Sequence, residues 1–355
     1  MRAVIEMPTH EGGFSVGFTS DFYTAEGRSA FGNLGWDLLE EAGIPYRSTG
    51  EKVADLSAED IRPFNAIAVL ARKVGAAALE GAPDLALVAR YGVGYDSVDV
   101  AACTRNGVLL TITPEGVRRP MATTNLCYLL ALSHRLLEQD RFTRAGGWAK
   151  KYELMGTGLS NRTLGVIGFG NIAREFIGLA KPLDMRIISH DPYANPELAA
   201  EMGVELVSLE ELLAQSDFVT VLCALTPETR HLLNAERLAL MKPTAYLIST
   251  ARGPIVDQAA LTRVLQERRI AGAGMDVWEQ EPVDPNDPIL KLDNVIVSPH
   301  GLALTDEWIW ITGRVAMGAV MDVAAGKIPS NVVNRDVIDS PLLQAKLDRF
   351  REAAR

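Results

Sequence analysis

The stretch Leu164-Gly165-Val166-Ile167-Gly168-Phe169-Gly170-Asn171-Ile172-Ala173 decides the fold of this chain. It reads as a buried strand, a glycine turn of the form G-x-G-x-x-[G/A], and the start of a helix at Asn171 and Ile172. Gly168 allows the tight turn, and Gly170 lets the backbone approach a pyrophosphate. The amides at the start of the helix then face the phosphate oxygens. The stretch predicts a dinucleotide site, but a glycine turn alone also fits a purely structural role, so its surroundings decide.

The residues after the turn support the dinucleotide interpretation. We expect a helix at 172–181 and a strand at 186–189, which leads to Asp191 about twenty positions after the glycines. A carboxylate at that place accepts hydrogen bonds from the adenosine ribose and repels a 2′-phosphate. No arginine follows in His190-Asp191-Pro192-Tyr193. The sequence therefore predicts NAD(H) rather than NADP(H).

The same alternation of apolar runs and amphipathic segments extends along most of the chain. In the first third we expect strands at 66–70, 85–89 and 108–112, and helices at 74–80 and 97–106. From residue 163 onward we expect strands at 164–168, 186–189, 218–222, 246–249, 271–275 and 295–298, and helices at 172–181, 209–215 and 257–268. This rhythm predicts an α/β fold with two doubly wound parallel sheets, and 355 residues suffice for two domains.

Three segments lie outside this rhythm. The stretch 8–32 is polar and rich in glycine, so we expect a long loop or insertion. We expect one long helix at 121–145, which Pro120 opens as a first-turn residue. From Thr305 the tail is expected to form a helix, an irregular segment at 329–334, and a short charged helix.

Composition excludes several classes of protein. The net charge of −10 leaves no excess of basic residues for binding nucleic acid. No run approaches the roughly 20 apolar residues that a membrane-spanning helix needs, and M-R-A-V-I-E-M-P lacks the apolar core of a signal peptide. The three cysteines have no C-x-x-C spacing, which fits a reducing compartment. We expect a cytoplasmic protein without a membrane, nucleic-acid or metal partner.

Three segments that follow expected strands carry chemistry. They are S-T-A-R-G at 249–253, D-V-W-E-Q-E-P at 276–282 and S-P-H at 298–300. Ligands of open α/β sheets bind at the carboxyl ends of the strands. Arginine binds a carboxylate through two N–H donors, histidine transfers a proton near neutral pH, and a carboxylate orients the histidine. Together these residue types are the parts needed to reduce a carbonyl group.

These motifs, in this order, resemble those of the D-isomer-specific 2-hydroxyacid dehydrogenase family, which includes phosphoglycerate dehydrogenase and glyoxylate/hydroxypyruvate reductase. The resemblance covers nearly the whole chain, because V-G-x-D at 93–96 and N-V-V-N at 331–334 are also similar to family segments. It implies that Arg252, Glu281 and His300 are catalytic. His300 would protonate the ketone oxygen, Glu281 would hold its ring, and Arg252 would bind the substrate carboxylate. Glu279 is a rival carboxylate, but Glu281 precedes the proline as in the motif.

The resemblance also implies binding residues. The amides near Val93 and Gly94 would complete the site for the substrate carboxylate. The cofactor would meet Thr229, Thr250 and Asp276, of which Asp276 would hold the nicotinamide carboxamide. The remaining histidines, which include His231, lie in no comparable motif and are expected to be ordinary surface or core residues.

The family's architecture implies a discontinuous first domain. Residues 1–119 and 303–355 would form a flavodoxin-like substrate-binding domain, and residues 120–302 a Rossmann NAD-binding domain. The helix at 121–145 would build a homodimer through the NAD-binding domain, with Trp148 near the interface. The substrate would be a small D-2-hydroxy acid or 2-keto acid.

The sequence departs from the family at several places. Val117 and Thr123 stand where members commonly have asparagine and glutamate, and Gly301-Leu302 follows the histidine where isoleucine is usual. Arg72 and Lys73 follow the strand at 66–70, at the edge where ligands bind. We hypothesise that one of them, Arg72 or Lys73, contacts a second acidic group on the substrate; the alternative is that both are solvated surface residues.

Two other functions share these motifs. One is a non-catalytic NADH sensor similar to the corepressors of this fold, which the acidic charge disfavours. The other is a branch acting on formate or phosphite, and Glu281 disfavours the formate version because that branch carries glutamine there. Among acids, glyoxylate, hydroxypyruvate, pyruvate and larger or doubly charged acids all remain open.

Overall fold

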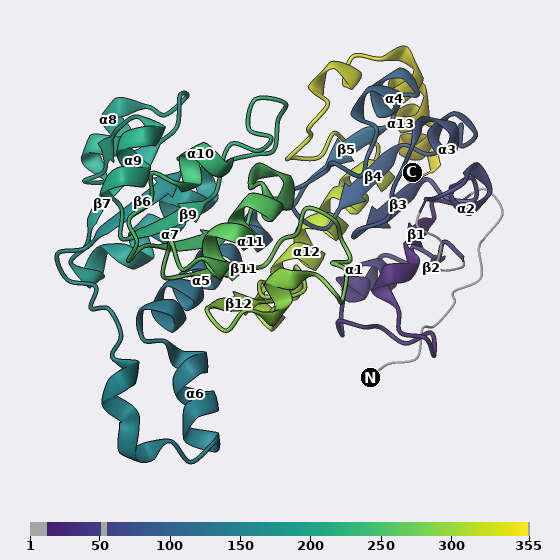
Figure 1. Ribbon diagram of the computed structural model, residues 1–355. Helices are drawn as coiled ribbons and strands as arrows, with labels where there is room; N and C mark the ends of the chain where they lie inside the picture. The colour runs from purple at the N-terminus through teal and green to yellow at the C-terminus, as the bar shows by residue number, and fades with distance from the viewer. Residues whose placement is uncertain (1–12, 51–54, 354–355) are drawn as a thin grey trace. The chain divides into compact units, whose positions relative to one another are not determined.

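The computed structural model describes residues 13–50 and 55–353 and divides into two compact units (Figure 1). The first unit comprises Met1–Val117 and Thr305–Arg355, and the second comprises Arg118–Leu304. The division expected from the sequence, at 119/120 and 302/303, lies close to both boundaries. No helix in the described part of the chain is both long and apolar enough to cross a membrane.

The first unit is built on a parallel sheet of five strands within the described residues, in the order β2-β1-β3-β4-β5. This is the flavodoxin-like order that the sequence predicts. The strands are β1 (Val16–Phe18), β2 (Tyr46–Ser48), β3 (Ala66–Val69), β4 (Leu87–Arg90) and β5 (Leu109–Thr111). The helices are α1 (Trp36–Glu41), α2 (Ala58–Ile61), α3 (Ala76–Glu80), α4 (Val100–Arg105), α12 (Asp306–Ala324) and α13 (Pro341–Ala353).

The second unit is built on a parallel sheet in the order β12-β11-β10-β9-β6-β7-β8. Counted from β6, this is the Rossmann order 3-2-1-4-5-6 with one added strand, so the predicted fold class is confirmed. The strands are β6 (Thr163–Ile167), β7 (Arg186–His190), β8 (Glu205–Leu206), β9 (Phe218–Val221), β10 (Tyr246–Ser249), β11 (Gly272–Met275) and β12 (Val295–Val297). The helices that accompany them are α7 (Asn171–Ala180), α8 (Pro196–Glu201), α9 (Leu209–Gln215), α10 (Ala235–Leu238) and α11 (Gln258–Gln266).

The expectation of a long loop at 8–32 is wrong for its described part, because β1 lies within it; residues 8–12 are outside the described residues. Strand β1 has only three residues, Val-Gly-Phe, and it pairs with both β2 and β3. The strand is hard to recognise because serine and threonine flank it. Ser15 is nevertheless buried, because its N–H donates to Asn65 Oδ1 at 3.0 Å and its hydroxyl to Pro63 O at 3.1 Å. Buried polar groups with partners of this kind carry little penalty.

The expectation of a single long helix at 121–145 is also wrong. Helix α5 (Pro114–Ser133) starts earlier and contains Pro120 in its interior, because Pro114 takes the first-turn position. It ends where Thr157 N–H donates to Ser133 O at 2.7 Å and Arg135 turns to a φ of 52°. A second helix, α6 (Leu136–Arg144), then packs beside the 3-10 segment η2 (Trp148–Leu154) to form an arm (Figure 1).

The C-terminal helix α13 is attached to the first unit by a buried ammonium group. Lys346 Nζ donates to Leu85 O at 2.6 Å, Asn106 O at 2.8 Å and Gly107 O at 3.2 Å. Burial lowers the pKa of Lys346 to about 8. The side chain therefore holds carbonyl groups from the segments before β4 and β5.

We expect Lys346→Met to lower the free energy of unfolding by about 1–3 kcal/mol at a pH of about 9.5, because those carbonyls lose their donor. The loss should be smaller at a pH of about 7. Between about 8 and the ordinary value of 10.5 only the unfolded chain holds the proton, so the wild type gains stability as pH rises through this window. Urea unfolding of both proteins at the two pH values checks this. A loss that shrinks as pH rises would contradict it.

Candidate functional site

The glycine turn connects β6 to α7 in the conformation that its sequence requires. Gly168 has a φ of 101°, and a Cβ there would lie 2.8 Å from Cys223 N. Gly170 is exposed, and a Cβ there would meet nothing within 4 Å. The backbone over Gly170 is therefore open to an approaching group. Asn171 and Ile172 form the first turn of α7, and Ala173 is fully buried where the helix meets the sheet.

Asp191 lies beside this turn. It follows β7 directly, and its Oδ2 accepts a hydrogen bond from Phe169 N at 2.7 Å. Its Oδ1 accepts from Tyr193 N at 2.9 Å. An ionised carboxylate has about four acceptor positions, so both oxygens can still accept from hydroxyl groups. The side chain that the spacing singled out is therefore joined to the glycine turn itself.

The three segments that carry the candidate catalytic residues are bound to one another. A Cβ at Gly253 would lie 1.8 Å from Trp278 O, so the turn after Arg252 packs directly on the backbone that follows β11. Trp278 Nε1 donates to Ser298 O at 3.0 Å, which joins that backbone to the segment after β12. The carboxyl ends of three neighbouring strands thus present their side chains together.

His300 and Glu281 form a hydrogen-bonded pair. His300 Nδ1 lies 2.7 Å from Glu281 Oε2, and Trp278 N donates to Glu281 Oε1 at 3.0 Å. Burial alone would raise the pKa of Glu281, but the hydrogen bond and charge of His300, the Trp278 amide and the charge of Arg252 together lower it. Arg252 Nη1 also donates to Ala251 O at 2.7 Å. Glu281 is therefore a carboxylate that holds one ring nitrogen of His300.

Asp276 supports the turn that carries His300. It is 1% exposed, and its Oδ1 accepts from Ser298 Oγ at 2.5 Å, Gly301 N at 3.1 Å and Leu302 N at 3.2 Å. One carboxylate oxygen thus fixes the backbone directly after His300. His300 itself has a left-handed backbone conformation, with a φ of 51°.

Two threonines expected near a cofactor are held by local hydrogen bonds. Thr250 is buried, and its hydroxyl donates to Asn125 Oδ1 at 3.1 Å. Thr220 donates to the same oxygen at 2.7 Å. Thr229 Oγ1 donates to Ala224 O at 2.7 Å and accepts from Thr226 N at 2.7 Å, which closes the loop after β9. Asn125 lies on α5 and belongs to none of the sequence motifs, so only the fold brings it to these two threonines.

A second histidine–carboxylate pair lies on the same unit. His231 Nε2 is 2.5 Å from Glu279 Oε1, and Arg230 Nη2 is 3.9 Å from the same oxygen. Glu279 Oε2 also accepts from Gln258 N at 3.4 Å. No sequence pattern indicates this pair, since the two residues are 48 positions apart.

The residues expected to bind substrate in the first unit follow β3 and β4. Arg72 Nε lies 3.9 Å from Asp21 Oδ2, which also accepts from Ala71 N at 2.7 Å. Val93 and Gly94 are half-buried in the loop after β4. Asp99, further along this loop, caps α4, because its side chain accepts from Ala102 N at 2.8 Å.

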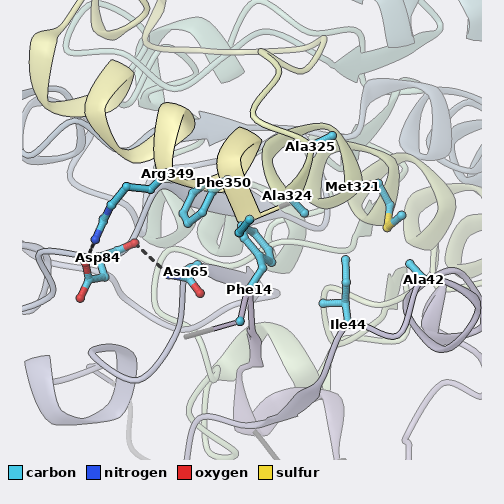
Figure 2. Close-up of a pocket in the computed structure, with 12 residues that line it drawn as sticks. Phe14, Ala42, Ile44, Asn65, Asp84, Met321, Ala324, Ala325, Arg349 and Phe350 are labelled. Carbon is cyan, nitrogen blue, oxygen red and sulfur yellow. Dashed lines mark hydrogen bonds and ion pairs between the residues drawn. The ribbon is translucent and has the colours of Figure 1, made fainter. Parts of the chain in front are cut away.

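Figure 2 shows a separate cavity in the first unit, of about 560 Å³. Apolar side chains such as Phe14, Ile44 and Met321 line it, and the ion pair of Arg349 with Asp84, at 2.9 Å, lies at one end. None of the residues singled out in the sequence lines this cavity.

Comparison with known proteins agrees with the geometry. Residues 126–301 match the family described as D-isomer specific 2-hydroxyacid dehydrogenase, NAD binding domain. A glyoxylate reductase of Thermococcus litoralis is 40% identical over 289 residues, which cover 79% of this chain and 87% of the relative.

Two solved structures resemble most of the chain. The TT0316 protein of Thermus thermophilus superposes with a TM-score of 0.81 at 30% identity, covering 90% of this chain and 100% of the other. The D-lactate dehydrogenase of Aquifex aeolicus, complexed with NAD and lactic acid, has a TM-score of 0.78 at 28% identity, covering 90% and 99%. The chain belongs to the D-isomer-specific 2-hydroxyacid dehydrogenase family and carries that family's NAD-binding domain.

Proposed function

We propose that this NAD-dependent D-2-hydroxyacid dehydrogenase acts on a small 2-keto acid or D-2-hydroxy acid with His300, Glu281 and Arg252 as its catalytic residues. The cofactor supplies or accepts the hydride at C2 of the acid. The observation that supports the proposal best is the 2.7 Å contact of His300 with Glu281 at the end of the sheet, with Arg252 on the neighbouring segment.

The residues around the glycine turn fit NAD(H). The left-handed Gly168 and the open backbone over Gly170 leave room for a pyrophosphate, and Asp191 can accept from ribose hydroxyls. We assign the pyrophosphate to the amides of Asn171 and Ile172. The other cofactor contacts that we propose are from Thr229, Thr250 and Asp276.

The pairing of His300 defines its proton chemistry. Because Nδ1 is held by Glu281, Nε2 is the nitrogen that faces the substrate. As imidazolium, His300 donates the Nε2 proton to the carbonyl oxygen during reduction and takes it back during oxidation. Glu281 stabilises the charge that His300 carries in between.

Arg252 binds the substrate carboxylate with two donors and polarises the carbonyl. In the first unit we assign further substrate contacts to the amides of Val93 and Gly94. Arg72 would serve substrates with a second acidic group, which its half-buried guanidinium could pair with.

The proposal is tested by NADH oxidation with glyoxylate, hydroxypyruvate, pyruvate and a doubly charged 2-keto acid. The relatives named glyoxylate reductases make glyoxylate the first member of the panel. Turnover of at least one acid is expected, and the ranking identifies the substrate. Intact NADH binding without turnover of any member would overturn the proposed reaction.

We expect Asp191→Asn to raise kcat/KM for NADPH relative to NADH by about 10-fold, equivalent to about 1.4 kcal/mol. The amide removes the negative charge that repels a 2′-phosphate but keeps an oxygen that can accept from Phe169 N. Steady-state kinetics with both cofactors check this. An unchanged ratio would remove Asp191 from cofactor selection.

We also propose that the chain forms a homodimer through its NAD-binding domain. The arm of α6 and η2, together with Met155 directly after it, exposes large apolar side chains: Trp148 is 71%, Tyr152 82%, Met155 82% and Leu136 56% exposed. Exposed apolar groups that gather on one element favour a protein partner, and a second copy of the chain would cover them.

A further inference from the structure

Helix α5 places the ring of Tyr128 inside the second unit. The residue is 1% exposed, and its ring lies against β11 at Gly274, where a Cβ would be 2.4 Å from Tyr128 Cδ1. Only a glycine in the strand leaves room for this ring. The position of the phenol is therefore set by the backbone of β11 as well as by α5.

The phenol begins a chain of hydrogen bonds with a defined direction. Tyr128 OH lies 2.5 Å from Ser298 Oγ, which lies 2.5 Å from Asp276 Oδ1. That oxygen acts as an acceptor, because the amides of Gly301 and Leu302 also point at it. Ser298 has one hydroxyl proton and must give it to Asp276. Tyr128 is therefore the donor to Ser298.

We propose that Tyr128 is a positioning residue that fixes, through Ser298 and Asp276, the turn that carries His300. The inference rests on the proposed role of His300. If the Tyr128 donor is lost, Ser298 is free to rotate away from Asp276. The carboxylate then loses the partner that orients it toward the amides of Gly301 and Leu302, and the turn loosens.

The hydroxyl, rather than the ring, is the part that this role needs. Phenylalanine would fill the same space against Gly274 and keep the packing. Burial raises the pKa of Tyr128 well above its ordinary value, despite the opposing hydrogen bond with Ser298, so the phenol keeps the proton that it donates. The effect of Tyr128→Phe therefore isolates one hydrogen bond.

The test compares Tyr128→Phe with Tyr246→Phe. Tyr246 is also a buried tyrosine of this unit, in β10, but its hydroxyl bonds to Thr157, away from the strand-end segments. Hydrogen exchange of the peptide 299–304 is measured with NADH present, together with kcat, KM and the isotope effect with deuterated NADH. A urea midpoint for each variant controls for general destabilisation.

We expect exchange at 299–304 to become several-fold faster in Tyr128→Phe and to stay unchanged in Tyr246→Phe. The kcat of Tyr128→Phe should fall about 5- to 10-fold, the rate equivalent of one neutral hydrogen bond, with a larger isotope effect and little change in KM for the 2-keto acid. Adding Tyr128→Phe to Ser298→Ala should then cost little more, because the chain is already broken.

Unchanged exchange at 299–304 would overturn the proposal, and so would faster exchange with a wild-type kcat. Faster exchange in a protein whose wild type turns over no 2-keto acid would instead overturn the proposed reaction, while Tyr128 would still hold the turn. The two ideas therefore fail in distinguishable ways.

Discussion

Replacing His300 with alanine is expected to lower kcat for 2-keto acid reduction by about 10²- to 10⁴-fold, because the reaction loses its proton donor. NADH binding should persist, since the glycine turn and Asp191 do not depend on the imidazole. Stopped-flow and steady-state measurements of NADH oxidation, with NADH fluorescence as the binding readout, check both statements.

The chain offers a matched control for this variant. His231→Ala removes another partly exposed histidine that also contacts a carboxylate, because its Nε2 lies 2.5 Å from Glu279 Oε1. We expect its kcat to stay within a few-fold of the wild type. If His231→Ala were the inactive variant and His300→Ala were active, the acid–base role would belong to the other pair.

Arg252→Ala is expected to lower kcat by about 10²- to 10³-fold, the typical loss for one preorganised donor to a developing oxyanion. KM for the 2-keto acid should rise as well, because the carboxylate loses its two-pronged partner. Arg252→Lys should recover only part of the loss, since lysine keeps the charge without the planar pair of donors.

Kinetics of both variants on the preferred acid give the measurement, and Arg230→Ala is the control. Arg230 is an arginine of the same unit whose side chain is 57% exposed and lies 3.9 Å from Glu279. A near-wild-type Arg252→Ala enzyme would end the assignment of the substrate carboxylate to this residue.

The sequence predicts those parts of the site whose structure depends on residues close together in the chain. The shape of the turn at Gly168 depends on neighbouring residues, and a glycine is needed there because Cys223 N would lie 2.8 Å from a Cβ. Asp191 is separated from the turn by one helix and one strand of ordinary length, so its distance in sequence predicts its place. Arg252 and His300 follow strands whose apolar runs are easy to recognise.

The parts that the sequence does not predict depend on contacts between distant residues. Tyr128 and Ser298 are 170 positions apart, and nothing near Tyr128 distinguishes it from a packing aromatic. The pairing of His231 with Glu279 is of the same kind. The strand β1 was missed because its buried polar neighbours find partners, such as Asn65, that no local pattern reveals.

The attachment of α13 has a consequence for synthesis on the ribosome. The backbone of Val333 and the side chain of Asn334 form hydrogen bonds with strand β5. Lys346 donates to the carbonyl groups of the segments that precede β4 and β5. Every residue of the second unit is made before these groups exist, so that unit can fold while the first still lacks its last helices. Synthesis of the first unit therefore starts before that of the second unit and ends after it. A nascent chain that stops before residue 305 would contain all residues of the NAD-binding domain but only part of the first unit.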